Sequence, residues 1–447
     1  MSSSTLAVFG GTPVLERGDY RQWPFVGNDE RAAVLRALDR RIVSGGYAPE
    51  ARALEQEFAA LVGCRHALLT HAGTSAIELA VGALGIGPGD EVIVPAYTFI
   101  ASAMCVLQRG AIPRFVDVRE DTGLLDAELV AGAVNGRTKA IMPVHVHGTP
   151  CDMDPIRGIA ERHGLAIVED AAQAHLATYR GTPCGALGHT AGFSLQASKN
   201  LSAGEGGIFT TNDDALAERA IRIRSFGLDV RLPDHESFDP SAPLDGDRPL
   251  VSSMMGHMFR GNEMMAAFAR AQLARLPEAT RAAQANAERL IAALAELPGV
   301  RPPVVPSDRT SAFHKVRVGF DLDALGGDVP PRAFRAALMK ALNAEGAYAV
   351  LWQDEPIPAH PIFRAFEGYG GGWPFRLAED PEALRRSYDP ACYPVARRVL
   401  DHSVILFSQS RPLIAQTRSV VDRFAEAFRK VWTDLDGLLR LAADERG

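Results

Sequence analysis

The regular alternation of short apolar segments with helical patterns between residues 66 and 211 is the feature that most limits what this chain can fold into. The apolar segments are rich in Val, Ile and Phe, as in βαβ units that build a largely parallel, buried sheet. Strands are predicted at 66–70, 91–94, 114–118, 140–145, 166–169, 191–195 and 207–211, and helices at 75–84, 101–108 and 155–163. The predicted fold class is therefore α/β, with a seven-stranded, mostly parallel sheet. Because parallel sheets hold ligands at the carboxyl ends of their strands, residues that follow a predicted strand are the first candidates for a site.

The pattern changes after residue 220. Residues 228–251 are crowded with Asp, Pro and Ser, and we expect a surface loop there that acts as a lid or an interface. A long helical pattern at 262–297 is ended by RPPVVP at 301–306. We expect a large domain over 1–298, which includes an N-terminal arm, and a smaller α+β domain over 299–447. The smaller domain is predicted to contain strands at 314–320 and 347–351, a loop at 366–375 and a closing helix at 417–438.

The composition is that of a globular protein, with 47% hydrophobic and 23% charged residues among 447. A net charge of -7 without a Lys- or Arg-rich run argues against nucleic acid as a partner. The charge-free stretches 92–108 and 181–198 contain Pro, Gly and polar residues, so they do not predict a membrane span, and the start MSSSTLAVFGG lacks the regions of a signal peptide. Five scattered cysteines without a CxxC pair predict neither disulfides nor a structural zinc site. We therefore expect a cytoplasmic protein without a metal.

The segment from Thr70 to Ser75 joins a predicted strand to a predicted helix through Gly73. The free N–H groups and the dipole of a helix start attract an anion, and the hydroxyls of Thr74 and Ser75 can donate hydrogen bonds to phosphate oxygens. A helix start that holds no ligand is the alternative interpretation.

Two further chemical groups follow predicted strands. Asp170 should face the site because side chains alternate along a strand and Glu169 then points the other way. An aspartate that caps a helix is the alternative. Lys199 follows the strand at 191–195 and precedes a glycine cluster at 204–207. The chain has only five lysines, at 139, 199, 315, 340 and 430. This scarcity makes a solvated surface lysine a less attractive explanation for Lys199.

An anion-binding helix start, a carboxylate and a lysine, each at a strand end, form the arrangement that pyridoxal 5'-phosphate (PLP) requires. The lysine binds the cofactor covalently, the acid pairs with the pyridine nitrogen and the helix start holds the phosphate. Burial and a neighbouring cation lower the pKa of such a lysine, so that its amine can act as a nucleophile and later as a base.

Longer runs of the sequence resemble one family. The runs VEDAAQAH, FSLQASKNLSAGEGGIFTTND, HAGTSAIELAVGALGIGPGDEVIVPAYTFIAS and KAIMPVHVHG are similar to segments of the DegT/DnrJ/StrS sugar aminotransferases, which are fold-type I PLP-dependent enzymes. The resemblance implies that Lys199 binds the cofactor covalently, that Asp170 pairs with the pyridine nitrogen and that Gln173 lies near the phenolic oxygen. It also implies that Gly73, Thr74 and Ser194 bind the phosphate and that Phe99 lies over the pyridine ring.

The resemblance further implies a homodimer with shared active sites, because family members send the segment that contains Arg260 into the neighbouring site. They usually read G-Y-N-Y-R where this chain has Gly-His-Met-Phe-Arg at 256–260. Met258 thus replaces the asparagine that reaches the partner's phosphate, and that contact is lost or supplied by another residue such as Asn262. The loop at 228–251 is also longer than in most members.

The opening FGGTPV and the segment HPIFRAFEGYGGGWPF resemble the longer members that aminate ketocyclitols and ketosugars in antibiotic pathways. We therefore expect transfer of an amino group from glutamine or glutamate to a ketosugar or ketocyclitol, with free cyclitols preferred to nucleotide-linked sugars. Sugar 3-dehydrases have histidine in place of the lysine, so Lys199 argues against that activity. A dehydratase of the aminohydroxybenzoate synthase type and a non-catalytic PLP-binding regulator remain alternatives.

Polar side chains near the strand ends are candidates for substrate binding. Substrate hydroxyls can be bound by His71, His145, Gln173, His314 and Tyr369, and the donor carboxylate by Arg260 or Arg411. His145 and His147 lie two residues apart, but a metal site needs a third ligand, so we expect packing rather than metal binding there.

Overall fold

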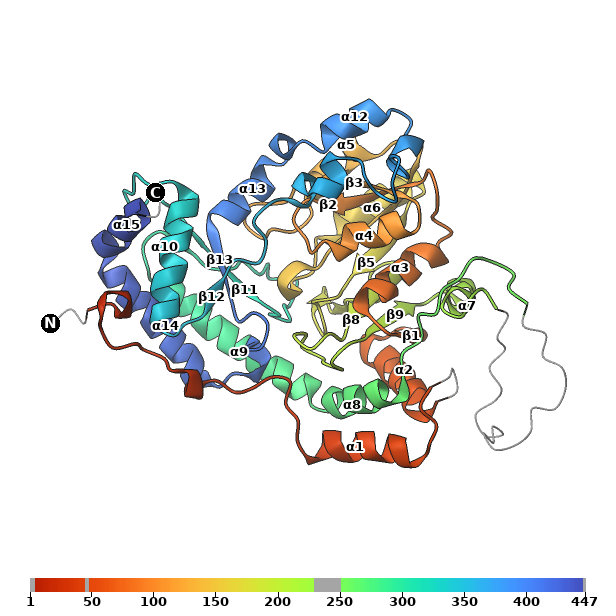
Figure 1. Ribbon diagram of the computed structural model, residues 1–447, viewed down its shortest axis with the longest axis horizontal. Helices are drawn as coiled ribbons and strands as arrows, with labels where there is room; N and C mark the ends of the chain where they lie inside the picture. The colour runs from red at the N-terminus through yellow and green to blue at the C-terminus, as the bar shows by residue number, and fades with distance from the viewer. Residues whose placement is uncertain (1–4, 45–47, 229–250, 445–447) are drawn as a thin grey trace.

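The computed structural model describes residues 5–44, 48–228 and 251–444. Its larger sheet has seven strands in the order β1-β9-β8-β5-β4-β2-β3 (Figure 1). Strand β9 runs antiparallel to both of its neighbours, and the other pairs are parallel. The seven strands are β1 (His66–Thr70), β2 (Glu91–Pro95), β3 (Ile112–Val116), β4 (Thr138–Ile141), β5 (Ala166–Asp170), β8 (Thr190–Ser194) and β9 (Gly207–Thr211). The predicted α/β class with a seven-stranded, mostly parallel sheet is confirmed.

Helices connect these strands and cover the sheet. Helix α3 (Gly73–Ala83) packs against β8 and β9, and also against α4 (Ala101–Gln108) and α7 (Asp214–Ile223). The other helices of this part are α1 (Asn28–Asp39), α2 (Pro49–Val62), α5 (Ala127–Ala133), α6 (Met153–His163) and α8 (Glu263–Leu273), with a short hairpin of β6 (Thr178–Tyr179) and β7 (Thr182–Pro183). Because α3 lies directly on the sheet, its first turn is held next to the ends of β1 and β8.

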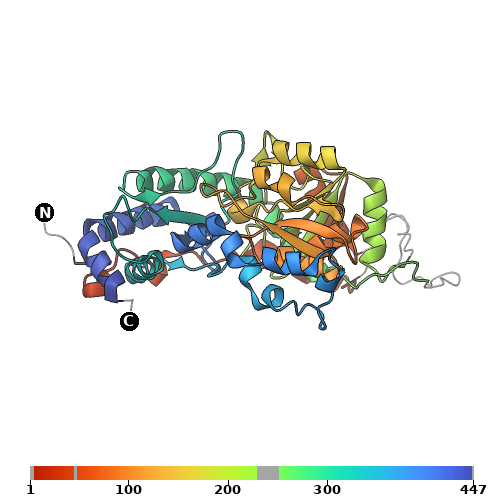
Figure 2. The same cartoon turned by 90° about the horizontal axis from the view of Figure 1, so that it is seen from above.

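A second, antiparallel sheet lies at the other end of the molecule (Figure 2). Its strand order is β10-β11-β13-β12. The strands are β10 (Val300–Arg301), β11 (Val316–Phe320), β12 (Ala349–Val350) and β13 (Ser403–Leu406), and the helices that follow β10 are α10 (Pro331–Ala344), α11 (Pro361–Arg364), α12 (Pro381–Ser387), α13 (Pro394–Asp401), α14 (Arg418–Thr433) and α15 (Leu435–Asp444). Helix α9 (Leu276–Ala295) precedes β10 and packs against α14. We propose a domain boundary at 298/299, between the end of α9 and the start of β10.

The N-terminal arm packs on the C-terminal part, although the sequence assigned it to the large domain. Its short 3-10 helix Ala7–Phe9 contacts α10. The backbone N–H of Ala7 donates to Glu345 Oε1 at 2.7 Å, and that of Leu15 donates to the Glu345 carbonyl at 2.9 Å. The arm therefore ties the start of the chain to α10 (Pro331–Ala344) in the C-terminal part.

Several boundaries differ from the sequence expectation; β3, for example, is Ile112–Val116 rather than 114–118. The helical pattern at 262–297 forms two helices, α8 and α9, because Pro277 occupies the first turn of α9 and cannot donate a hydrogen bond to a continuous helix. Strand β4 ends at Ile141 rather than at 145. The closing helix is also two helices, α14 and α15. Of the predicted loop at 228–251, residues 229–250 lie outside the described residues.

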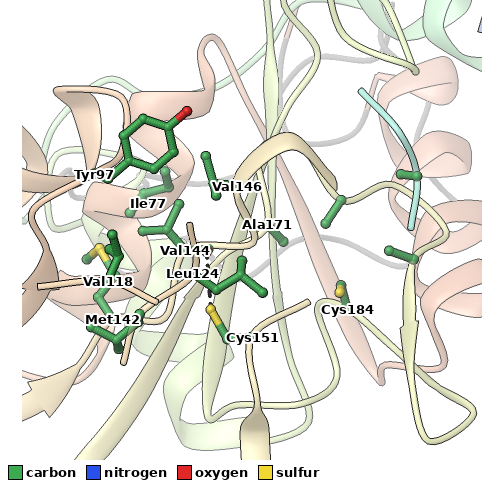
Figure 3. Close-up of a cluster of buried hydrophobic side chains, with 14 of the residues drawn as sticks. Ile77, Tyr97, Val118, Leu124, Met142, Val144, Val146, Cys151, Ala171 and Cys184 are labelled. Carbon is green, nitrogen blue, oxygen red and sulfur yellow. Dashed lines mark hydrogen bonds between the residues drawn. The ribbon is translucent and has the colours of Figure 1, made fainter. Parts of the chain in front are cut away.

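A buried apolar cluster lies beneath the carboxyl ends of the central strands (Figure 3). It includes Ile77 from α3, Tyr97 from the segment after β2, Val144 from the segment after β4 and Ala171 from the residue after β5, all almost inaccessible to solvent. Close packing of this kind holds the strand ends in fixed positions. None of the described helices is long and apolar enough to cross a membrane.

Candidate active site

Lys199 follows β8 in a tight turn, where its backbone N–H donates to the Gln196 carbonyl at 2.8 Å. Gly204 and Gly206, which have positive φ values, lead the chain back into β9. Burial lowers the pKa of the Lys199 amine to about 8, and the charge of Asp170 acts in the opposite direction. The amine is therefore partly neutral near pH 8 and close to a buried carboxylate, as a nucleophilic lysine requires.

Asp170 is the last residue of β5 and is buried. Its Oδ2 accepts a hydrogen bond from Ser102 Oγ at 2.6 Å, and its Oδ1 accepts one from the Ala172 N–H at 3.1 Å. Burial raises the pKa of this carboxyl, whereas the two hydrogen bonds and Lys199 oppose the change. Within the described residues no cation forms an ion pair with Asp170, so a protonated ring nitrogen would supply the charge that it lacks.

The first turn of α3 forms a cradle for an anion. Ala72 precedes the helix and no side chain caps its first N–H groups. A Cβ added to Gly73 would lie 2.5 Å from the Cβ of Ser194, so only glycine permits this approach of α3 to the end of β8. Thr74 and Ser75 are the next residues of the helix, and Ser194 is the last of β8. The structure brings these four residues together, and the open helix start fits a phosphate group.

Gln173 and Phe99 flank the same strand ends. Gln173 Oε1 accepts a hydrogen bond from the His147 N–H at 2.7 Å, which leaves the amide nitrogen as a donor. Phe99 lies in the segment between β2 and α4 and is 51% exposed. An exposed aromatic ring at this edge of the sheet fits a role in covering a planar cofactor.

Arg260 lies beside β1 of its own protomer. It forms an isolated antiparallel bridge with Thr70, and the His71 N–H donates to the Phe259 carbonyl at 2.9 Å. Met258 is 42% exposed. Asn262, the suggested replacement for the family asparagine, instead caps α8, where its Oδ1 accepts from the Met265 N–H at 2.9 Å. The capping bond engages this oxygen and explains why asparagine stands at this position.

His145 is fully buried and both of its ring nitrogens have partners. Its Nε2 lies 3.0 Å from Glu169 Oε2, and its Nδ1 accepts from the Cys151 N–H at 3.1 Å. This geometry removes His145 from the candidate substrate contacts. His145, Glu169 and Cys184 lie close together, but Glu169 also accepts the N–H groups of residues 185, 187 and 188 at 2.6–2.8 Å. We infer that the cluster fixes the loop after β7 and is a structural network. The sequence favoured packing because it revealed no third ligand, whereas the structure places Glu169 and Cys184 beside His145.

The other proposed substrate residues lie in different surroundings. His71 is exposed, and its Nε2 lies 3.2 Å from Ser75 Oγ. Tyr369 is also exposed and donates to the Gln108 carbonyl at 3.2 Å. His314 is buried next to Lys315, and its pKa is lowered by burial and by the charges of Lys315 and Lys199. His314 is therefore the one of these three that the electrostatics connect directly with Lys199.

Arg411 lies away from this cluster. Its guanidinium stacks 3.5 Å from the ring centroid of Tyr348 and 4.6 Å from that of Tyr20. The three side chains line a hollow of about 260 Å³ beside the smaller sheet, and neither Lys199 nor Asp170 lines it. The structure thus separates Arg411 from the proposed cofactor site.

The sequence assigned none of several further residues near Lys199 and Asp170 to the site, and it considered His147 only as a possible metal ligand. They are Ser102, His147, His175 and Lys315, with the aromatic residues Tyr97 and Trp352. The rarity of lysine was the one available signal for Lys315. For the others, no local pattern distinguishes a residue that faces a site from one that faces the core.

The geometry can be compared with known proteins. Residues 24–375 match the model of the DegT/DnrJ/EryC1/StrS aminotransferase family. The chain belongs to this family. It is a PLP-dependent aminotransferase. That cofactor fits the uncapped start of α3, the buried Lys199, and Asp170, which forms no ion pair with a cation of the described residues. Bound PLP supplies an electron-withdrawing ring that allows an amino group to leave one substrate and enter another.

Individual relatives agree with this assignment. The chain is 42% identical to the dTDP-3-amino-3,4,6-trideoxy-alpha-D-glucose transaminase of Streptomyces venezuelae over 286 residues, which are 63% of this chain and 70% of the relative. The crystal structure of DesI in the presence of its TDP-sugar product matches with a TM-score of 0.78 and 28% identity over 100% of both chains. That of 3-amino-5-hydroxybenzoic acid synthase matches with a TM-score of 0.75 and 30% identity, over 92% of this chain and 98% of the other.

Proposed function

We propose that this aminotransferase moves an amino group from glutamine or glutamate to a ketosugar or ketocyclitol in the biosynthesis of a secondary metabolite. The observation that carries the proposal is the position of Lys199, whose amine has a pKa lowered to about 8 and interacts with Asp170 at the strand ends. An amine that is neutral in part at physiological pH can bind a carbonyl carbon and can move a proton between substrate atoms.

The other side chains are assigned roles by position. Asp170 keeps the pyridine nitrogen protonated, and Gln173 donates to the phenolic oxygen through its free amide nitrogen. Phe99 covers the ring. The phosphate is held by Gly73, Thr74, Ser75 and Ser194, with Arg260 contributing from the neighbouring protomer. The roles of Asp170, Gln173, Phe99, Gly73, Thr74 and Ser194 are those the family resemblance implies, and the surroundings of these residues support them. Ser75 is added because it lies in the same helix start, and the role of Arg260 rests on the resemblance alone.

The relatives favour a nucleotide-linked acceptor over the free cyclitol preferred from the sequence. One is named for a dTDP-linked amino sugar, and another was crystallised with its TDP-sugar product. We therefore propose a nucleotide-linked ketosugar as the first acceptor to test and free cyclitol ketones as the second.

We also propose that the protein is a homodimer with shared sites. The segment 251–259 pairs with residues 225–228 through bridges between Ser225 and Met258 and between Leu228 and Ser252. Four large apolar side chains on these segments are exposed to solvent in the single chain: Phe226, Val251, Met255 and Met258. Such a concentration of exposed apolar residues is typical of a protein interface, and it lies on the segment that family members send into the neighbouring site.

A matrix of donors and acceptors tests the proposed function. The holoenzyme is incubated with glutamine or glutamate, and its visible absorption band should shift to that of the aminated cofactor. Nucleotide ketosugars or scyllo-inosose-like ketones should then restore the original band. Restoration by simple 2-oxo acids alone would identify an amino-acid aminotransferase and contradict the proposed acceptor.

Dehydration and aromatisation of a cyclic ketone is a second candidate function, favoured by the match to 3-amino-5-hydroxybenzoic acid synthase. The retained Lys199 is compatible with it. In the same matrix, formation of an aromatic product with its own ultraviolet absorption would identify this activity.

A further inference from the structure

Lys315 is a second buried lysine whose task the proposed function leaves open. It precedes β11 and is 7% exposed. Its Nζ lies 3.0 Å from His314 Nε2 and 5.6 Å from the centroid of the Trp352 ring. Across the described part of the chain, no carboxylate forms an ion pair with it. An ammonium removed from water without a counter-charge is costly, so such a group is retained where a ligand supplies the charge.

The groups around Lys315 are hydrogen-bond donors without acceptors. If His314 Nε2 accepts from the lysine, the proton of the neutral imidazole is on Nδ1, which is buried and has no partner. His147, whose ring centroid lies 4.8 Å from that of Trp352, offers a second such group: if the Tyr97 hydroxyl donates to its Nε2 at 2.7 Å, the proton is on the buried Nδ1, which has no partner among the described residues. A cluster with one ammonium and unsatisfied N–H groups is complementary to an anion.

This cluster lies next to the turn that carries Lys199, because Asn200 Nδ2 donates to the Ala312 carbonyl at 2.7 Å and the Lys315 N–H donates to the His147 carbonyl at 3.4 Å. Burial lowers the pKa values of His147, His314 and Lys315, that of Lys315 to about 7, and the charge of Lys199 adds to each decrease. An anion bound by Lys315 is thus close to the reacting amine. An amino-acid donor carries its carboxylate on the carbon that bears the amino group, so this charge must lie within a few bonds of the reaction. The ring of a sugar or cyclitol places no charge there, and the pyrophosphate of a nucleotide sugar is separated from the reacting carbon by the ring.

We propose that Lys315, supported by His314, binds the carboxylate of the amino-acid donor. The proposal rests on the proposed function, because it identifies the cation that an amino-acid donor requires. It replaces the expectation for Arg411, whose guanidinium is stacked between two tyrosines away from Lys199. It also releases Arg260 from that task.

The test compares holoenzyme variants at Lys315 in a binding experiment and in two half-reactions. Glutarate, which has the carboxylates of glutamate but no amino group, is titrated by calorimetry. Lys315→Met keeps the length and apolar stem of the side chain, and its affinity for glutarate should fall about tenfold or more. Lys315→Arg should retain part of the affinity. Lys139→Met, which changes an exposed lysine on β4, is the matched control and should bind as the wild type does.

In the half-reactions, Lys315→Met should require about tenfold more glutamate for half-maximal amination of the cofactor. Its reoxidation by the keto acceptor should be unchanged, which a general loss of structure would not produce. Three outcomes would overturn the proposal. They are equal losses in both half-reactions, a glutarate affinity of Lys315→Met within twofold of that of the wild type, and no glutarate binding by the wild type. A different outcome separates this proposal from the proposed function. If the wild type binds glutarate through Lys315 but no amino donor aminates its cofactor, the proposed function is contradicted and the anion site remains.

Discussion

Lys199 and Lys315 show how burial prepares two lysines of one chain for different tasks. Each loses hydration, and each has its pKa lowered, to about 8 and about 7 respectively. They differ in what faces them. Lys199 has the carboxylate of Asp170 nearby, whereas Lys315 faces an imidazole and an indole ring. The carboxylate beside Lys199 suits an amine that reacts within the site. The absence of a carboxylate beside Lys315, among the described residues, suits a cation that binds and releases an anionic ligand.

Replacement of Lys199 by alanine should abolish the visible band of the covalently bound cofactor. The protein should stay folded because the structure shows no hydrogen bond from the Lys199 side chain to another described residue. Absorption and circular dichroism spectra measure the two effects, with Lys139→Ala as the control. Persistence of the band in Lys199→Ala would show that another lysine binds the cofactor.

Asp170→Asn should retain the cofactor and lose most of its turnover. The amide oxygen can still accept from the Ala172 N–H and the amide nitrogen can donate to the Ser102 hydroxyl oxygen, but the amide has no charge to keep the pyridine nitrogen protonated. The loss of electron withdrawal should lower kcat on the order of 10²-fold or more. Steady-state kinetics and a cofactor titration measure both properties. A rate close to that of the wild type would contradict this role of Asp170.

The lowered pKa of Lys315 predicts how stability depends on pH in the cofactor-free protein. In the unfolded chain this amine has a pKa of 10.5, and in the folded chain a pKa of about 7. Between these values the unfolded state binds more protons, so the lysine opposes folding fully below pH 7 and this effect is lost as the pH rises toward 10.5. Lys315→Met should therefore be more stable than the wild type at pH 6.5, on the order of 1 kcal/mol or more.

Urea unfolding of the cofactor-free proteins at several pH values measures this difference in the free energy of unfolding. The advantage of Lys315→Met should shrink at pH 9.5, and Lys139→Met should show no such trend. An advantage that does not vary with pH would indicate improved packing rather than removal of a buried charge.

At the scale of elements, the strands of the large sheet could be predicted because each is a short apolar run bounded by turn residues. Their ends were less predictable. The apolar run at 140–145 continues beyond β4, but Pro143 cannot donate to a neighbouring strand and His147 adopts a positive φ of 59°. Strand β13 was missed because SVIL follows directly on α13 without a turn signal. Pairing with β11 rather than local pattern makes it a strand.

Gly73→Ala tests the link between the first turn of α3 and the end of β8. The added Cβ would lie 2.5 Å from that of Ser194 and must push the two elements apart. The affinity for PLP should fall about tenfold or more, while the fold is kept. Gly158→Ala in α6 is the control, since its Cβ would meet nothing closer than Arg162 Nη1 at 3.5 Å. Equal cofactor affinity in the two variants would show that the phosphate is held elsewhere.

At the scale of the whole molecule, local sequence reasoning reached the half of the site that lies on one sheet. Lys199, Asp170 and Gly73 each follow or precede a recognisable strand, and parallel strands bring their ends to one edge. Lys315 and Trp352 come from the C-terminal part, and no periodicity specifies how that part docks against the first. Long-range packing therefore decides which of its side chains face Lys199.

The last prediction concerns Arg260, for which the structure and the family resemblance suggest different sites. Within one chain, its bridge with Thr70 places Arg260 near its own α3, whereas the resemblance places it in the site of the partner. Mixing inactive Lys199→Ala with inactive Arg260→Ala protomers distinguishes the two. If sites are shared, half of the dimers are mixed and each mixed dimer has one site with both residues intact, which gives about a quarter of wild-type activity. If Arg260 serves its own chain, every site lacks one residue and no activity returns. Native mass spectrometry is the control, because either result is informative only if mixed dimers have formed. A protein that stays monomeric at working concentration would contradict the proposed homodimer.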